Sequence, residues 1–241
     1  MISIVIPAYN EERRISNTLK EYCELFKDDE IIISLNACTD RTLEIVKEFQ
    51  KEYSNLKYIE LDLGAKGNAV KCGFEIAKGD YIGFADADCS TSAKEFARMF
   101  GSLGDNDGII ASRYMKDSVV SPKQSWKRIL VSRMFNLFVN TLLWLGYKDT
   151  QCGAKIFKRE AVLQVLPEIK TVKWAFDVDL LYHMKRDGFK IKEFPTVWED
   201  KEYSTLNVFQ AGPNMLLGVI RLRLLYSPFK FIILDIYDKI K

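Results

Sequence analysis

The stretch YIGFADADCS, residues 81–90, joins an apolar run to two carboxylates, Asp86 and Asp88, one residue apart. An apolar run of this length, bounded by polar residues, predicts a buried β-strand. Ligands of open α/β folds bind at the carboxyl ends of parallel strands, so both carboxylates would lie at the ligand-binding edge. Their oxygens suit Mg²⁺ or Mn²⁺. A solvated turn can have the same sequence, so the pattern needs support from the rest of the chain.

Four other short apolar runs alternate with segments of helical period. The runs lie at residues 2–7, 30–35, 56–61 and 107–112, and amphipathic helices are predicted over residues 11–26, 40–53 and 67–78. Asp40 is placed to cap the second of these helices. We therefore predict an α/β fold with a mostly parallel central sheet flanked by helices. The first turn has no G-x-G-x-x-G, which argues against a nicotinamide-binding domain.

The second half of the chain differs in charge and in hydrophobic pattern. Residues 1–120 carry 15 Lys and Arg against 21 Asp and Glu, whereas residues 121–241 carry 20 against 12. A long helix is predicted to start at Ser121-Pro122 and to run to about residue 145. Further on we predict a helix over 176–188, a strand over 190–198 and C-terminal amphipathic helices. We divide the chain into a domain of residues 1–210 and an amphipathic helical tail of residues 211–241.

The basic segments of the second half favour a membrane surface over nucleic acid. Neither the long helix that runs to about residue 145 nor the tail of residues 211–241 reaches the roughly 18–20 uninterrupted apolar residues of a spanning helix. Their cations are interleaved with aliphatic runs, which suits an anionic membrane surface, although packing on the domain would produce the same pattern. The five cysteines form no C-x-x-C pair, and the first ten residues lack the features of a signal peptide. We therefore expect a cytoplasmic protein that is peripheral to the membrane.

Six motifs in order along the chain resemble those of the family 2 glycosyltransferases with a GT-A fold. They are VIPAYNEE (5–12), NACTD (36–40), GAKGNA (64–69), DADCS (86–90), ASRY (111–114) and DTQCGAKIF (149–157). The branch that they most resemble is that of the dolichyl-phosphate mannose and glucose synthases, and the similarity extends from residue 2 to about residue 204. Each motif alone is unremarkable, but six in order are hard to obtain by chance.

The resemblance implies a nucleotide-sugar site beside a divalent ion. Asn36 stands where an Asp is common in the family, which keeps a hydrogen-bonding side chain but removes a charge and leaves the identity of the base open. Ser90 stands where some relatives supply a Gln to the metal. The implied metal ligands are Asp86, Asp88 and Ser90, with Mg²⁺ or Mn²⁺ as the cofactor. The implied donor-binding residues are Pro7, Tyr9, Glu11, Asn36, Asp40, Lys66, Gly67, Ala69 and Asp86.

The resemblance also implies an acceptor-phosphate site. Arginine suits the oxygens of a phosphate in geometry as well as in charge. Asp149 matches an acidic position on the acceptor side, where it could act as a base or orient the acceptor. Thr205 departs from a Lys that relatives often have beside the Ser. The implied acceptor residues are Arg113, Arg128, Ser132 and Ser204, and the catalytic candidates are Asp88, Arg113 and Asp149.

The function that these implications give is an inverting, metal-dependent hexosyl transfer from a nucleotide sugar to a polyprenyl (dolichyl-type) phosphate. The resemblance slightly favours UDP-glucose over GDP-mannose. One alternative is the same fold transferring to a saccharide or another hydroxyl acceptor. A second is a nucleotide-sugar-binding protein at the membrane that no longer catalyses, for which Asn36 and Thr205 leave room.

Overall fold

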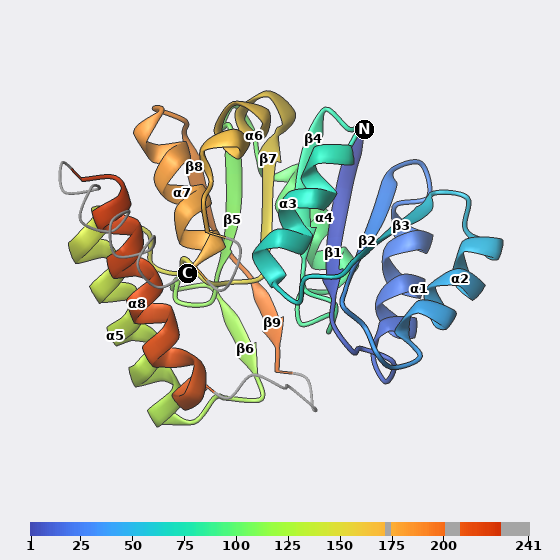
Figure 1. Cartoon of the computed structure of the whole chain (residues 1–241), viewed down its shortest axis with the longest axis horizontal. Coiled ribbons are helices and arrows are strands. Elements are labelled where there is room, and N and C mark those ends of the chain that lie inside the picture. Colours follow the sequence, from blue (N-terminus) through green and yellow to red (C-terminus); the bar gives the residue numbers. More distant parts are fainter. Residues whose placement is uncertain (172–174, 201–207, 228–241) are drawn as a thin grey trace.

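The computed structural model describes residues 1–171, 175–200 and 208–227, and within them a central sheet lies between two layers of helices (Figure 1). The strands are β1 (Ile2–Ala8), β2 (Glu30–Asn36), β3 (Leu56–Leu61), β4 (Tyr81–Ala85), β5 (Gly108–Ser112), β6 (Val119–Ser121), β7 (Ala154–Lys158), β8 (Ile191–Pro195) and β9 (Val197–Glu199). The helices are α1 (Ile15–Leu25), α2 (Thr42–Glu52), α3 (Lys66–Ile76), α4 (Ala93–Gly101), α5 (Trp126–Leu143), α6 (Arg159–Val165), the 3₁₀ turn η1 (Leu166–Glu168), α7 (Phe176–Arg186) and α8 (Val208–Leu225).

The main sheet has the strand order β3-β2-β1-β4-β7-β5-β8, and β6 pairs with β9 in a separate two-stranded sheet. The five strands predicted from apolar runs are present and lie parallel in the main sheet, as does β8, whereas β7 is antiparallel to both of its neighbours, β4 and β5. The predicted mostly parallel sheet flanked by helices is therefore confirmed. Because β7 runs backwards, its first residue lies at the same edge as the last residues of β4 and β5.

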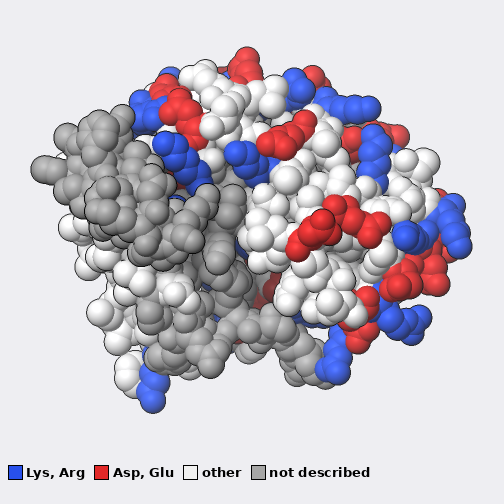
Figure 2. Space-filling view, in the orientation of Figure 1, with Lys and Arg blue, Asp and Glu red and all other residues white. Residues whose placement is uncertain are grey.

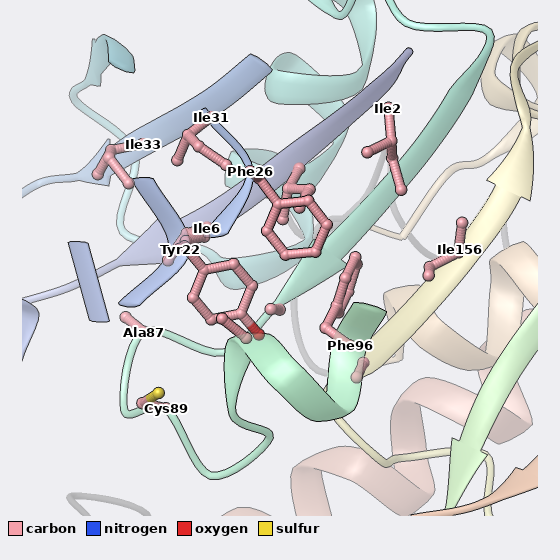
Figure 3. Packing of buried hydrophobic residues seen from close by; sticks show 14 of the residues in the cluster. Ile2, Ile6, Tyr22, Phe26, Ile31, Ile33, Ala87, Cys89, Phe96 and Ile156 are labelled. Carbon is pink, nitrogen blue, oxygen red and sulfur yellow. The ribbon is translucent and has the colours of Figure 1, made fainter. Parts of the chain in front are cut away.

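Two hydrophobic cores cover the two faces of this sheet. Alternate residues of β1 point to opposite faces, so that Ile2, Ile4 and Ile6 join one core while Val5 joins the other. In the first core, Tyr22 of α1 and Phe26, just after this helix, meet Phe96 of α4 (Figure 3). The Tyr22 hydroxyl also donates a hydrogen bond to the backbone oxygen of Thr91 at 2.8 Å. This anchors the loop that follows β4 to α1.

The predictions for the second half need two corrections at element ends. Helix α5 begins at Trp126 and not at Ser121-Pro122, because Val119–Ser121 pairs with β9 and the Ser125 hydroxyl accepts the amide of Arg128 at the helix start. The strand predicted over residues 190–198 divides into β8 and β9, which belong to different sheets. Helix α8 spans the predicted boundary at residues 210 and 211, and residues 228–241 of the expected tail lie outside the described residues.

Helices α5 and α8 pack against each other beside the sheet (Figure 1). Among the described helices, none combines the length and the apolar character that crossing a bilayer requires. Helix α5 nevertheless leaves large apolar side chains in solvent. They are Trp126, Ile129, Leu130, Met134, Leu137 and, just after the helix, Trp144.

Candidate active site

One edge of the main sheet gathers most of the residues that the sequence singled out. The carboxyl ends of β1, β2, β4 and β5 open at this edge, together with the start of β7. Residues that follow the first four of these strands therefore lie near residues that precede β7, and Tyr9 and Asp149, 140 positions apart, share this edge. The edge carries Tyr9, Glu11, Asn36, Asp86, Asp88, Arg113 and Asp149.

Asp86 lies between a lysine and a glycine. Lys66 Nζ, at the start of α3, donates to Asp86 Oδ1 at 2.6 Å. Burial disfavours the charged form of Lys66, but the attraction of Asp86 outweighs it, so the pKa of Lys66 is raised. On its other side, Asp86 fills the space where a side chain of Gly153 would be, since an added Cβ there would lie 1.7 Å from Asp86 Oδ2. Gly153 is thus required for Asp86 to occupy its position.

Asp88 and Ser90 continue the same loop. The Ser90 amide donates to Asp88 Oδ1 at 2.9 Å, and Oδ2 of the same carboxylate takes no part in this hydrogen bond. The Ser90 side chain is buried, and its hydroxyl has no hydrogen-bond partner among the described residues. Arg14 Nη1 lies 3.9 Å from Asp88 Oδ2. The sequence analysis missed Arg14, although it follows Glu11 by three residues and immediately precedes α1.

Glu11 holds Arg14 through a two-point contact. Arg14 Nε and Nη2 donate to the two carboxylate oxygens of Glu11, each at 2.7 Å. The backbone amide of Glu11 donates in turn to Thr42 Oγ1 at 2.8 Å. Burial raises the pKa of Glu11, with Asp86 and Asp88 adding to the effect and Arg14 opposing it. The shift indicates that the three carboxylates lie near enough to repel one another.

A divalent ion fits this loop if water and the substrate bound beside it supply the remaining ligands. The described residues contain no group of three or more His, Cys, Asp or Glu side chains placed to hold an ion. Mg²⁺ and its analogues are often bound by one or two carboxylates together with water and phosphate oxygens. Asp86 and Asp88 match that pattern, and the unpartnered hydroxyl of Ser90 lies on the same loop. These residues are too few to coordinate an ion without ligands from water or substrate.

The other residues expected to bind the donor have distinct structural roles. Tyr9 is half-exposed just after β1, whereas Pro7 lies within that strand, and Gly67 and Ala69 are buried in the first turns of α3. Asn36 Oδ1 accepts the backbone amide of Ala65 at 2.8 Å, which fixes the chain just before α3.

The expected cap of α2 differs in its detail. Arg41 occupies the capping position, and Asp40 instead accepts the amide and hydroxyl of Thr42 through Oδ1 and the amide of Glu12 through Oδ2. Burial would raise the pKa of Asp40, but these hydrogen bonds outweigh it, so its pKa is lowered. Asp40 thus ties the turn after β1 to the start of α2.

Arg113 and Asp149 form a buried pair on the acceptor side. Arg113 Nε and Nη2 donate to the two oxygens of Asp149 at 2.7 and 3.0 Å, and the Arg113 amide donates to the same carboxylate at 3.1 Å. Burial raises the pKa of Asp149, but Arg113 overcomes this effect and the net pKa is lowered. A carboxylate with a lowered pKa and both oxygens occupied is a poor general base. The geometry favours a role in orienting Arg113.

Helix α5 and two aromatic rings extend the acceptor side. The Tyr114 hydroxyl donates to Ser132 Oγ at 2.7 Å, and the guanidinium of Arg128 lies 5.9 Å from the centre of the Trp198 ring. Arg113 lies 5.5 Å from each of these rings, so both connect it to α5. Arg128 is also paired with Asp200 at 2.5 Å. Ser204, the remaining acceptor candidate, lies outside the described residues.

A second ion pair, missed by the sequence analysis, lies beneath the site. Lys155 of β7 is fully buried, and its ammonium donates to Asp177 Oδ1 at 2.5 Å and to the backbone oxygen of Cys152 at 2.7 Å. The Lys155 ammonium lies 5.1 Å from the centre of the Phe84 ring, and that of Lys66 lies 5.8 Å from it. Lys155 thus braces the segment that carries both Asp149 and Gly153.

Comparison with known proteins gives a consistent result. Residues 3–166 match the sequence profile described as Glycosyl transferase family 2. A dolichyl-phosphate beta-glucosyltransferase of Dictyostelium discoideum is 31% identical over 93% of this chain and 74% of its own length. The human protein of the same description is 31% identical over 93% of this chain and 75% of its length. Glycosyltransferase AglD of Haloferax volcanii is 32% identical over 83% of this chain, which corresponds to 33% of AglD.

Solved structures resemble the fold at low sequence identity. Glucosyl-3-phosphoglycerate synthase from Mycobacterium tuberculosis, in complex with Mn²⁺, UDP and glucosyl-3-phosphoglycerate, superposes with a TM-score of 0.71 at 18% identity and covers 93% of this chain and 78% of its own. Staphylococcus aureus TarS with UDP-GlcNAc superposes with a TM-score of 0.59 at 17% identity, covering 94% of this chain and 67% of its own. At such identities the likeness establishes the fold alone.

Proposed function

Because the chain belongs to glycosyltransferase family 2 and has the GT-A fold, we propose that it transfers glucose from UDP-glucose to a polyprenyl phosphate of the dolichyl type. Relatives that bear the name dolichyl-phosphate beta-glucosyltransferase align with more than nine-tenths of the chain, which supports this acceptor and this sugar. UDP is bound in two solved complexes of glucosyl-3-phosphoglycerate synthase, whose fold is similar. GDP-mannose is the competing donor.

The observation that carries the proposal is the segment of residues 149–153, which touches both halves of the site. At one end Asp149 holds Arg113, and at the other Gly153 abuts Asp86. Between them lies the buried Cys152, and burial raises the pKa of its thiol to about 12. Asp149, Arg113 and Asp86 all lie near enough to contribute smaller effects to this pKa. One segment of five residues thus contacts both a donor-side carboxylate and an acceptor-side arginine. Direct transfer needs the two bound substrates to be held close together, and this segment would hold their binding groups close.

The electrostatics favour a phosphate acceptor over a hydroxyl. A lipid phosphate is an anion at neutral pH, so it can attack the anomeric carbon without a strong base, and Arg113 and Arg128 would orient its oxygens. A hydroxyl acceptor would need a carboxylate to take its proton, and Asp149 is engaged by Arg113 through both oxygens. Attack from the face opposite the leaving diphosphate would invert the anomeric centre.

The donor side would stabilise the leaving diphosphate. Asp86 and Asp88 would hold a Mg²⁺ or Mn²⁺ ion, which supplies Lewis-acid stabilisation of the charge that develops on the leaving group. Lys66, at the start of α3, lies within reach of the same region and is paired with Asp86. The exposed ring of Tyr9 offers a surface against which the base could stack.

The exposed face of α5 suits the membrane in which such an acceptor resides. Trp126, Leu130, Met134, Leu137 and Trp144 recur at intervals that place them along one side of the helix, and all are at least half exposed. In Figure 2 the described surface at the lower left, where α5 and α8 lie in Figure 1, is mostly uncharged. Lys123, Lys127 and Arg133 adjoin this face and could meet anionic headgroups. We therefore assign α5 to the interface of the membrane, with the protein peripheral on its cytoplasmic face.

A panel of nucleotide sugars in a thermal-shift assay, with and without Mn²⁺, tests the donor half of the proposal. UDP-glucose should raise the melting temperature more than GDP-mannose or UDP-GlcNAc at the same concentration, because a ligand that binds the folded state more tightly stabilises it more. Asp88→Ala should remove the part of this shift that depends on Mn²⁺. An equal shift for all donors, or an unchanged shift in Asp88→Ala, would contradict the assignment.

Liposome flotation tests the membrane half. Leu137→Glu should reduce binding to anionic vesicles by an order of magnitude or more, since it places a charge in the centre of the apolar face. Lys20→Gln, at an exposed position of α1, is the control, because it also lowers the net charge by one unit. Equal binding by wild-type protein and Leu137→Glu would refute the assigned face.

A further inference from the structure

Arg14 lies at the metal-binding loop without any role in the function described so far. It immediately precedes α1, and its side chain is only 14% exposed. Glu11 occupies the Nε and Nη2 edge of its guanidinium, so the third nitrogen, Nη1, projects away from that contact. Nη1 is buried and has no hydrogen-bond partner among the described residues, since Asp88 Oδ2 at 3.9 Å is too far for one.

A buried guanidinium nitrogen without a partner is costly. Leaving a charged donor unpaired forfeits its hydration without a compensating bond, so native structures rarely keep one without a reason. The two-point grip of Glu11 also fixes Arg14 before any ligand arrives. A rigidly held cation with one free donor is a common way to bind an anion of defined geometry.

The charge balance of the loop indicates which anion this is. Glu11, Asp86 and Asp88 contribute three negative charges, and Arg14 and Lys66 contribute two positive charges. The cluster is therefore negative by one unit, which attracts a cation, and the loss of either basic residue would make it negative by two units and more repulsive to a diphosphate. When an ion occupies Asp88, this carboxylate no longer balances the charge at Arg14 Nη1, which is then available to another anion in the site.

We propose that Arg14 binds the diphosphate of the nucleotide-sugar donor through Nη1, and that it serves as the countercharge of Asp88 when no metal ion is bound. The inference rests on the proposed function, because it takes the donor to be a nucleoside diphosphate sugar. It assigns to α1 a direct part in holding the leaving group, in addition to Lys66 and the metal ion.

The proposal predicts opposite effects on two ligands when Arg14 is replaced. Arg14→Met makes the cluster more negative by one charge, so Mn²⁺ alone should bind several-fold more tightly. UDP in metal-free buffer should bind about tenfold more weakly or worse, the usual cost of losing a hydrogen bond to a charged group. Arg14→Lys, which keeps the charge, should recover most of the UDP affinity. Lys20→Met, exposed on the same helix, should leave both affinities as in the wild type.

Calorimetry for UDP and electron paramagnetic resonance for Mn²⁺ measure the two affinities separately. A variant whose local structure had merely collapsed would bind both ligands more weakly, and that result would overturn the proposal. Unchanged UDP affinity in Arg14→Met would overturn it as well, while leaving the proposed function intact. Wild-type protein that bound neither UDP nor GDP would refute the proposed function and this inference together.

Discussion

Replacement of Gly153 by alanine tests the contact that joins the two halves of the site. An added Cβ would lie 1.7 Å from Asp86 Oδ2, 2.2 Å from Cγ and 2.7 Å from Oδ1. All three distances are shorter than any contact that real Cβ atoms make, and they involve the whole carboxylate. Asp86 must therefore rotate away, which also breaks its 2.6 Å pair with Lys66.

The cost can be assembled from three contributions. Forcing an extra methyl into a packed site costs about 1–3 kcal/mol, and an off-rotamer Asp86 about 0.5–1.5 kcal/mol. The pair with Lys66 is partly exposed, so its loss adds at most about 1 kcal/mol. We expect Gly153→Ala to destabilise the fold by about 2–4 kcal/mol, which lowers the melting temperature by roughly 5–15 °C in a chain of this size.

A double-mutant cycle with Asp86→Ala isolates the contact. Once the carboxylate is gone, the added methyl has space, so Gly153→Ala should cost less than about 1 kcal/mol in the Asp86→Ala background. Gly101→Ala is the matched control, because a Cβ there meets nothing within 4 Å, and it should be neutral or stabilise the protein slightly. Equal costs of Gly153→Ala in the two backgrounds, measured by urea denaturation, would refute the contact with Asp86.

Three further perturbations probe the buried charges. Asp149→Asn leaves Arg113 without its carboxylate and should destabilise the fold by about 3–5 kcal/mol in urea denaturation; a loss below 1 kcal/mol would show that the pair is not desolvated. The pKa of Asp149 is lowered from its ordinary 3.8, so its ionised form stabilises the fold above about pH 4 and this stabilisation is lost as the pH falls through the lower, folded-state value. Wild-type stability should accordingly fall more steeply than that of Asp149→Asn below pH 4, and parallel profiles would contradict the assignment. Lys155→Met strands Asp177 and should cost about 3–5 kcal/mol, most of which the double variant with Asp177→Leu should recover; a double variant no more stable than Lys155→Met would count against a coupled pair.

The sequence predicted the features of the fold that local pattern determines. The runs at 2–7 and 30–35 are mostly apolar because both faces of β1 and β2 are buried, and such runs are typical of parallel strands. The strand β7 was not predicted, because its five residues include Lys155, whose burial depends on Asp177. The start of α5 was misplaced because Val119–Ser121 pairs with β9, a contact across almost 80 residues.

The candidate site was only partly predictable for the same reason. The motifs indicated which residues lie at the sheet edge, and the structure brings Asp86, Asp88, Arg113 and Asp149 to that edge. It also places Ser132 beside Tyr114. The roles of Arg14 and Gly153 depend on contacts with Asp88 and Asp86 that lie 74 and 67 positions away in the chain. No local pattern contains such contacts, so a motif can name the carboxylates but not the groups that hold them.

Transfer of labelled glucose to a short-chain polyprenyl phosphate tests the central claim most directly. With UDP-glucose and Mn²⁺ or Mg²⁺, the purified protein should label the polyprenyl phosphate and should not label the matching polyprenol, which has the same chain but only a hydroxyl. The product should have the anomeric configuration opposite to that of the donor. Labelling of polyprenol or of a saccharide in preference to the phosphate, or no transfer to any acceptor despite tight UDP-glucose binding, would contradict the account.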